Sequence, residues 1–206
     1  MLLIDVRIKN YKCILDSETF SIDQLTCLVG KNESGKSAIL QALYKLNPVD
    51  KEDTYDALYE YPKMYQTDFE AGLIEDGDTV VISHWKFTAE EIEALEKQFG
   101  TDFIGDSTVV TISNGYKNKR TWDFDANFHS LFEKKMEEFG FETSDRAQIP
   151  SYDSIGEVRA QLKSISTLSE AEQEFKKWFE VSFPNDRLDA FAEKNLLQYL
   201  PKFSYF

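Results

Sequence analysis

The residue types that could do chemistry gather in one short stretch, "GKNESGKS" from Gly30 to Ser37. Gly30, four further residues and then Gly35, Lys36 and Ser37 fit the Walker A phosphate-loop pattern GxxxxGK[ST] without a departure. Two glycines let the backbone turn so that successive amide groups face an anion. The Lys36 ammonium would reach the β- and γ-phosphates of a nucleotide, and the Ser37 hydroxyl would ligate Mg²⁺.

The expected phosphate-binding set covers the whole loop and the start of the segment after it. Its members are Gly30, Lys31, Asn32, Glu33, Ser34, Gly35, Lys36, Ser37 and Ala38. We expect ATP and Mg²⁺ as ligands, with Ser37 as the metal ligand. The alternative is a plain glycine turn before an ordinary helix, which the flanking elements disfavour.

A strand before the loop and a helix after it must position these residues. "QLTCLVG" at 24–30 is nearly all apolar at its end, as expected of a strand buried on both faces. From Lys36 the apolar residues recur at helical spacing until "NP" at 47–48. Alternating residues at 2–10, and more weakly at 17–23, predict two antiparallel strands ahead of the loop.

The next part of the chain predicts further strands. The acidic, tyrosine-rich segment 49–78 predicts a long excursion with a short helix or two. Residues 78–87 predict a strand, and a capping box at Thr88 predicts the start of a helix. Asn114-Gly115 between two β-rich runs predicts a hairpin with a tight type I′ turn.

From about residue 125 the pattern becomes helical, with apolar residues three and four apart. The sequence closes with "PKFSYF", a strand-like apolar stretch that would need a partner strand. We expect an α/β fold with a mixed sheet and a mainly helical second half. Residues 1–124 would form one lobe with a β-rich insertion. Residues 125–206 would form a helical segment ending in a strand that leads into further chain.

Composition excludes several classes of protein. With 206 residues and 42% hydrophobic content, the chain can build a substantial core. No apolar window is long enough to cross a membrane, and charges interrupt the N-terminus where a signal peptide needs an apolar core, so we expect a cytoplasmic protein. The net charge of -14 repels a nucleic-acid backbone, so any such binding would need another segment.

Metal and disulfide chemistry also find little support. The cysteines, Cys13 and Cys27, have no CxxC spacing, and the histidines are His84 and His129. We therefore expect no zinc site and no disulfide framework, and interpret both cysteines as buried structural thiols.

"IDVRIKNYKCILDSETFSIDQLTCLVGKNESGKSAILQALYKLNP" resembles the N-terminus of ABC-type ATPases of the OLD, RecF and SMC group. The resemblance covers about residues 1–48, and "DTVVISHWKFTAEEIEAL" at 78–95 resembles the next segment of OLD-like ATPases. It implies an ATPase head of the P-loop NTPase fold that dimerises around nucleotide and works in DNA repair or anti-phage defence. By analogy Lys12 would lie near the phosphates, although a solvated strand-end lysine is an equal interpretation.

The resemblance also implies elements that the sequence lacks. Such ATPases hydrolyse ATP with an apolar strand ending in Asp-Glu, and the nearest stretch, "GLIED" at 72–76, is interpreted as a turn. "LSEAEQ" at 168–173 echoes the signature helix start, but Ser169 and Glu172 explain it as a capping box. Structural roles are favoured for His84 and His129 over a switch histidine.

These observations predict an ATP-binding lobe that is incomplete for hydrolysis by itself. It would form a homodimer or hetero-complex through the ATPase head, with DNA or a nuclease reached through segments outside this chain. One alternative is a nucleotide-dependent module whose acidic helical half docks a partner without turning ATP over. Another is a self-contained P-loop kinase with Asp53 or Asp56 as its base.

Overall fold

The computed structural model describes residues 1–32, 34–74 and 78–205. These residues form two compact units. The sheet unit contains residues 1–86, 109–122 and 198–206, and the helical unit contains residues 87–108 and 123–197. The helical unit thus takes in residues 87–108 as well as most of the predicted second half.

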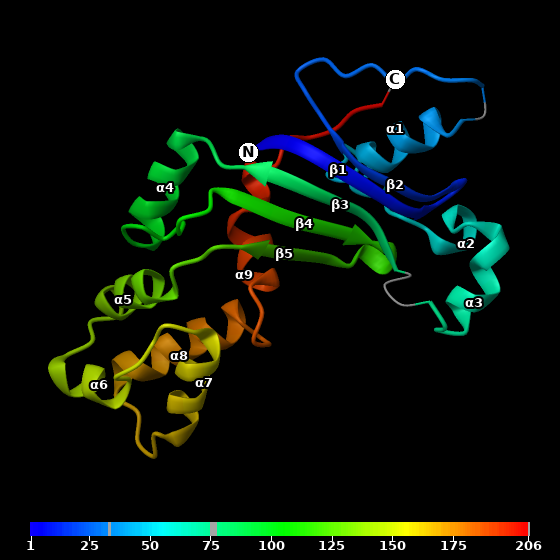
Figure 1. Ribbon diagram of the computed structural model, residues 1–206. Coiled ribbons are helices and arrows are strands. Elements are labelled where there is room, and N and C mark those ends of the chain that lie inside the picture. Colours follow the sequence, from blue (N-terminus) through cyan, green and yellow to red (C-terminus); the bar gives the residue numbers. More distant parts are fainter. Residues whose placement is uncertain (33, 75–77, 206) are drawn as a thin grey trace. The chain divides into compact units, whose positions relative to one another are not determined.

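The sheet has the strand order β2-β1-β3-β4-β5 (Figure 1). Its strands are β1 (Leu2–Tyr11), β2 (Ile14–Ser21), β3 (Thr79–Lys86), β4 (Val109–Gly115) and β5 (Arg120–Phe124). The β1–β2, β1–β3 and β3–β4 pairs are all antiparallel, which confirms the predicted N-terminal strand pair. The prediction of a mixed sheet is wrong for these pairs, and residues 24–30, the expected strand buried on both faces, are not in the sheet.

Helix α1 (Lys36–Tyr44) packs on β1 and β3 of the sheet. Alternation along β1 buries Val6 and Ile8 completely, as the two-residue period of a strand requires. On the helix, Ala38 and Ala42 are buried, four residues apart and therefore on one face. The face of α1 that carries these two small side chains is therefore the buried one.

The described residues of the segment 49–78 form the predicted excursion with short helices. They contain α2 (Ala57–Glu60), the 3₁₀ turn η1 (Lys63–Tyr65) and α3 (Gln66–Glu70). Aromatic packing holds this excursion on the sheet unit. Tyr61 stacks on Phe69 with ring centroids 4.2 Å apart, and both rings contact Tyr116. The excursion is therefore a folded part of the sheet unit.

The β4–β5 hairpin is confirmed, but its predicted tight turn at Asn114-Gly115 is wrong. Strand β4 continues to Gly115, and the 3₁₀ turn η2 (Tyr116–Asn118) follows it. Tyr116 explains the longer connection. Its ring is buried, its amide donates to Asp78 O at 2.8 Å and its hydroxyl donates to Asn10 O at 2.5 Å.

The predicted strand at "PKFSYF" is also wrong. Phe203 makes one parallel bridge to Pro48, and the other described residues of this stretch lie outside strands. Asn47 holds the segment instead. Its side-chain amide donates to the carbonyls of Leu200 and Pro201, both at 3.1 Å.

The helical unit confirms the helical pattern of the second half. It contains α4 (Ala89–Phe99), α5 (Phe128–Glu138), α6 (Thr143–Gln148), α7 (Ile155–Ser164), α8 (Glu170–Ser182) and α9 (Asp189–Asn195), and η3 (Leu197–Tyr199) follows α9. Helix α6 was not predicted. The capping boxes predicted at Thr88 and Ser169 are both present. Among the described residues, no helix is both long and apolar enough to cross a bilayer.

Candidate functional site

The glycine loop leads directly into α1. Gly35 stands at the helix N-cap with φ +90°, a left-handed conformation that favours glycine. A Cβ at Gly35 would lie 3.3 Å from Cys13 Sγ, so the turn between β1 and β2 closes against the loop. Both backbone angle and available space therefore favour glycine at this position.

The Lys36 side chain folds back into the loop. Its Nζ donates to Gly30 O at 2.7 Å and to Lys31 O at 2.5 Å, and it lies 3.4 Å from Ser34 Oγ. The ammonium group thus lies against two backbone carbonyl oxygens at the start of the loop. Lys36 is not packed into the core, since it keeps intermediate exposure.

The start of α1 also offers backbone donors. The first helical hydrogen bond runs from the Ile39 amide to Gly35 O at 2.9 Å. The amides of Lys36, Ser37 and Ala38 precede it and have no intrahelical partner. The first turn of α1, which the structure describes in full, contains no acidic residue. No carboxylate of this turn therefore competes with an external anion for the positive end of the helix dipole.

The remaining members of the predicted set divide into three groups. Lys31, Asn32, Ser34 and Ser37 are exposed. Ala38 is buried at 6% exposure, so its side chain belongs to the core and only its amide is available to a ligand. Glu33 lies outside the described residues. Their roles toward nucleotide stay predictions.

Lys12 lies in the turn between β1 and β2, beside the middle of α1. Its Nζ donates to Gln41 Oε1 and lies 4.0 Å from Glu60 Oε1, and its amide donates to Glu60 O at 2.6 Å. The structure thus brings the turn against α1 and places the Lys12 side chain on the helix. Contact of Lys12 with phosphate stays a prediction.

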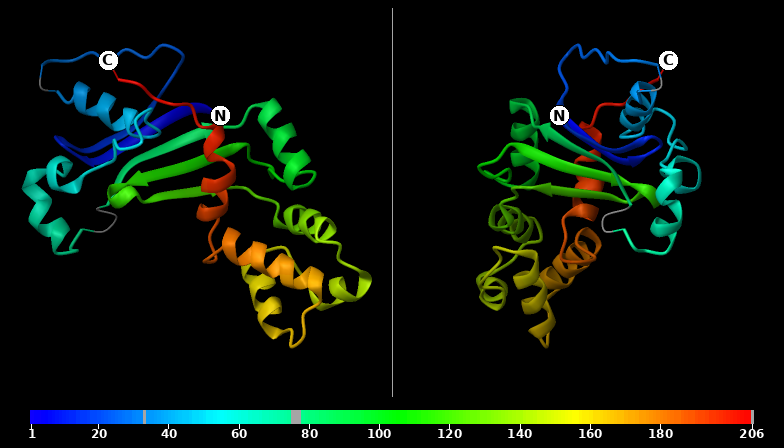
Figure 2. Two further views of the ribbon diagram at one scale, coloured as in Figure 1. Left: turned by 180° about the vertical axis from the view of Figure 1, so that it is seen from behind. Right: turned by 45° about the vertical axis from the view of Figure 1, so that its right-hand side comes forward.

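The segment before the loop differs from its prediction. Residues 24–30 form no strand, and Leu25 and Val29 are each 90% exposed. Figures 1 and 2 show this blue segment as an extended loop away from the strands. Both long sides of β1 are already paired, with β2 and β3, so β1 offers no free edge to this apolar run. The predicted strand buried on both faces is therefore wrong.

A buried acid at the far end of α1 was not foreseen from the sequence. Glu60 Oε1 accepts from Lys45 Nζ at 2.7 Å and from the Tyr11 hydroxyl at 2.8 Å, and Oε2 accepts from the Asp56 amide at 3.0 Å. Burial raises the pKa of Glu60, but these hydrogen bonds outweigh it and hold the pKa below its ordinary value. This network ties α1 to β1 and α2. Nothing in the acidic local sequence marks Glu60 among its neighbours.

Each histidine lies beside an aspartate, and the structural roles expected of both stay predictions. His84 Nδ1 lies 2.5 Å from Asp5 Oδ1, and His129 Nδ1 lies 2.8 Å from Asp153 Oδ1. Across the described part of the chain, no group of three or more His, Cys, Asp or Glu side chains could hold a metal ion.

The cysteine prediction is wrong, because Cys13 and Cys27 are both exposed thiols. Cys13 lies in the β1–β2 turn and Cys27 in the unpaired segment before the loop, so neither enters the core. Of "GLIED", Glu75 and Asp76 lie outside the described residues. Gly72 adopts φ +71°, which fits the predicted turn at its start.

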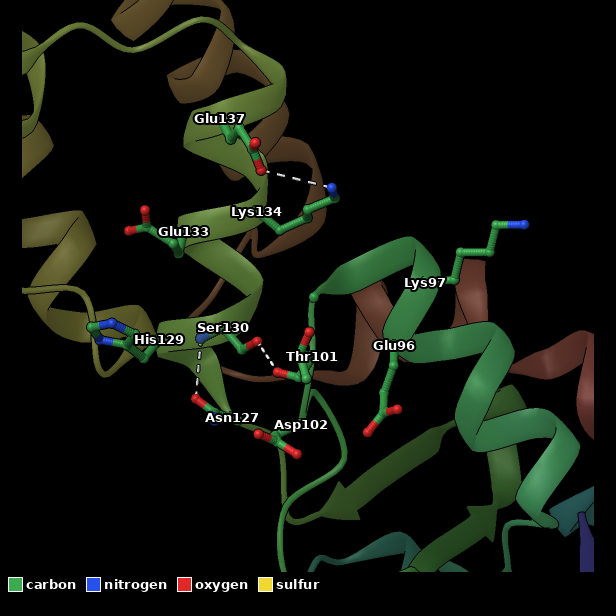
Figure 3. Close-up of a pocket in the computed structure, with 11 residues that line it drawn as sticks. Glu96, Lys97, Thr101, Asp102, Asn127, His129, Ser130, Glu133, Lys134 and Glu137 are labelled. Atoms are coloured by element: carbon green, nitrogen blue, oxygen red, sulfur yellow. Dashed lines mark hydrogen bonds and ion pairs between the residues drawn. The ribbon is translucent and has the colours of Figure 1, made fainter.

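The helical unit has an open pocket between α4 and α5 (Figure 3). Several of its polar side chains have hydrogen-bond or ion-pair partners. Ser130 Oγ donates to Thr101 O, and Lys134 Nζ lies 3.7 Å from Glu137 Oε2. At Glu133, hydrogen bonds from Tyr152 and Arg146 lower the carboxyl pKa. These contacts describe a polar seam between helices rather than a reactive centre.

Comparison with known families agrees with the loop geometry. A sequence model of the AAA ATPase domain matches residues 1–198, which include the glycine loop, α1 and all the strands of the sheet. A search of curated proteins found no match. The left-handed Gly35, the partly exposed Lys36 ammonium and the helix start without an acidic residue are compatible with the phosphate loop of a nucleotide-binding ATPase. On the extent of this match, the chain belongs to the AAA ATPase domain family.

Proposed function

We propose that residues 30–38 bind the phosphates of Mg·ATP. The observation that carries this proposal is the Lys36 ammonium, held by the carbonyls of Gly30 and Lys31 at the start of α1. A lysine in such a place carries three donors, which fit phosphate oxygens as well as carbonyls. ATP is the nucleotide that family membership favours.

Each residue of the loop has a role that follows from its chemistry. Lys36 neutralises phosphate charge, while the amides of Lys36, Ser37 and Ala38 donate to phosphate oxygens at the helix N-terminus. The exposed Ser37 hydroxyl is the ligand for Mg²⁺, which draws charge away from the phosphates when bound. Lys12 and Asn32 are weaker members of the same site, by analogy with the OLD, RecF and SMC group.

We further propose that these residues do not complete hydrolysis by themselves. The phosphate loop supplies donors and a metal ligand, but hydrolysis also needs an acid that polarises water. No apolar strand ending in Asp-Glu follows the loop in the sequence. The exposed apolar run at 24–30 supports the same proposal, because a strand of that composition is stable when other strands flank it. Further strands would supply both the neighbours and the acid.

The resemblance to the OLD, RecF and SMC group extends the proposal to biology. The chain would serve a DNA repair or anti-phage defence machine, as a head that dimerises around ATP. The net charge of -14 is unfavourable for direct contact with a phosphate backbone. DNA or a nuclease would therefore be reached through other segments or subunits, and the protein would work in the cytoplasm.

The kinase alternative fits the described geometry less well. Asp53 Oδ2 accepts from the Tyr44 hydroxyl at 2.5 Å, and Tyr44 ends α1. The nine residues of α1 separate that end from the loop by about 12 Å. Asp56 caps α2 by accepting from the Leu58 amide at 2.9 Å. Both candidate bases thus have structural roles at the end of α1 away from Lys36.

Calorimetric titration with Mg·ATP and Mg·GTP tests the proposal, combined with a phosphate-release assay on the same samples. We expect ATP binding without repeated turnover, and binding about 10–100-fold weaker in Lys36→Ala, because that change removes charge-assisted hydrogen bonds. The matched control is Lys97→Ala, an exposed lysine on α4. Equal ATP affinity in Lys36→Ala and the parent would contradict the site, and repeated turnover would contradict the incompleteness.

A further inference from the structure

The excursion between α1 and β3 exposes large apolar side chains. Tyr59 is 76% exposed, Met64 is 84% exposed, and Leu58 and Leu73 are 64% and 75% exposed. We call residues 57–73 the excursion segment. A single exposed apolar residue is ordinary on a protein surface, but several within one short segment mark an interaction site. Tyrosine and methionine are also types that interfaces favour.

The excursion segment is anchored, so its exposed side chains stand on a fixed backbone. Tyr61, inside the segment, is 2% exposed and stacks on Phe69. Glu60 is held by Lys45, and the Lys12 amide donates to Glu60 O at 2.6 Å. A preorganised surface loses little conformational freedom when a partner binds. The apolar exposure is therefore a property of the folded sheet unit.

The charge of the excursion segment indicates which kind of partner it would bind. Exposed acidic residues outnumber exposed basic residues within and just before the excursion segment. The acids are Asp50, Glu52, Asp53, Asp56, Asp68 and Glu70, and the bases are Lys51 and Lys63. Nucleic acid and anionic membranes would be repelled. A second copy of this chain would bring the same acids face to face, on a background net charge of -14.

We propose that the excursion segment docks a basic amphipathic segment of a partner protein. Leucine-like residues of the partner would cover Tyr59, Met64 and their apolar neighbours, while lysine or arginine would face the surrounding carboxylates. A protein interface usually has an apolar centre and a charged rim, and this part of the chain exposes residues of both kinds. The docking does not depend on nucleotide. It also differs from a docking role for the helical half, since it lies in the sheet unit.

Fluorescence anisotropy with a labelled synthetic peptide of leucine and lysine at helical spacing tests this proposal without ATP. We expect saturable binding that weakens as the salt concentration rises from about 0.05 M to about 0.5 M. A peptide with glutamate in place of lysine is expected not to bind. Asp68→Asn with Glu70→Gln is expected to reduce the salt dependence.

Location is tested with the double variant Tyr59→Ser, Met64→Ser, which keeps the net charge. We expect peptide affinity at least about tenfold lower, as for interface anchors. The matched control is Val181→Ser on α8, which removes an apolar side chain of 69% exposure elsewhere. Tyr59, Met64 and Val181 are all strongly exposed, so the variants should fold. Circular dichroism checks that they do.

Three outcomes would overturn the proposal. The first is no binding of the basic peptide to the parent. The second is equal affinity in the parent, the double variant and Val181→Ser, which would show general attraction to an acidic protein. The third is self-association of the parent that the Tyr59→Ser, Met64→Ser variant abolishes in sedimentation, which would assign the segment to contact between copies.

Discussion

At the scale of single residues, Gly35 carries two constraints together, a left-handed backbone and a close neighbour. Alanine in that conformation costs about 1–2 kcal/mol, and its Cβ would lie 3.3 Å from Cys13 Sγ. We expect Gly35→Ala to lower the free energy of unfolding by about that amount and to weaken Mg·ATP binding by at least about tenfold, because the loop must shift. Urea unfolding and calorimetry measure the two effects.

Gly140 provides the control for this prediction. It also has a left-handed backbone, at φ +75°, but a Cβ there would meet nothing within 4 Å. Gly140→Ala should therefore show the backbone cost alone and leave ATP affinity unchanged. If the two alanine variants bound ATP equally well, the loop geometry around Gly35 would have no bearing on nucleotide.

Glu60 carries a prediction about stability and pH. Its folded-state pKa is lowered from the ordinary value of 4.5, so its ionised form stabilises the fold above about that pH, and the contribution disappears as pH falls through the folded-state pKa. We expect Glu60→Gln to lower the free energy of unfolding by about 2 kcal/mol near pH 7, because it breaks a buried ion pair with Lys45.

Urea unfolding at about pH 7 and about pH 3 measures this effect, with the exposed Glu52→Gln as control. The difference between Glu60→Gln and the parent should shrink at the lower pH, while the control stays close to the parent at both. A difference that stayed constant with pH would show that the Glu60 carboxylate does not stabilise the fold through its charge.

At the scale of elements, sequence predicts what local patterns determine. Strand β1, helix α1 and the capped start of α4 follow from alternation, helical spacing and capping, and the structure has each of them. The prediction of a strand at residues 24–30 is wrong because a strand needs neighbouring strands to pair with, and no local sequence pattern indicates whether these are present. The prediction of a tight β4–β5 turn is wrong because the burial of Tyr116 requires a longer connection.

The candidate site shows the same difference between what local sequence determines and what the fold determines. The spacing of Gly35 and Lys36 predicts a phosphate loop from local sequence alone, and the binding of phosphate there stays a prediction. The Glu60 network could not be predicted, since it joins residues from β1, α1 and α2 that are up to 49 positions apart. Its members look like ordinary polar residues until the fold buries them.

The unpaired segment gives a prediction at this scale. Leu25 and Val29 are each 90% exposed, so Leu25→Ser and Val29→Ser should change the free energy of unfolding of the 206-residue chain by less than about 0.5 kcal/mol. Ile8→Ala, at a fully buried position of β1, should lower it by about 2–5 kcal/mol. Chemical unfolding of the three variants gives the comparison. A loss at Leu25 as large as at Ile8 would mean that the segment is packed.

At the scale of the whole molecule, the two compact units divide the chemistry. The predicted phosphate loop and the excursion segment both belong to the sheet unit, while aromatic side chains make up about half of the buried apolar residues of the helical unit. Phe179, for example, contacts Phe132 and Phe183 with ring centroids 5.8 Å and 5.4 Å apart. The helical unit therefore has its own source of stability. A ligand of the loop should act first on the sheet unit.

This division predicts where ATP stabilises the protein. Binding to the folded state at a concentration of about 100 times Kd adds about 2.7 kcal/mol to its stability. By hydrogen exchange, we expect slowly exchanging amides of β1 and α1 to gain up to about 100-fold protection with Mg·ATP, and amides of α7 and α8 to gain little. Lys36→Ala should lose the gain. Equal gains in protection in α7 and α8 would contradict a ligand effect confined to the sheet unit. Such a result would mean that the two units open together, so that amides of the helical unit exchange only when the sheet unit unfolds.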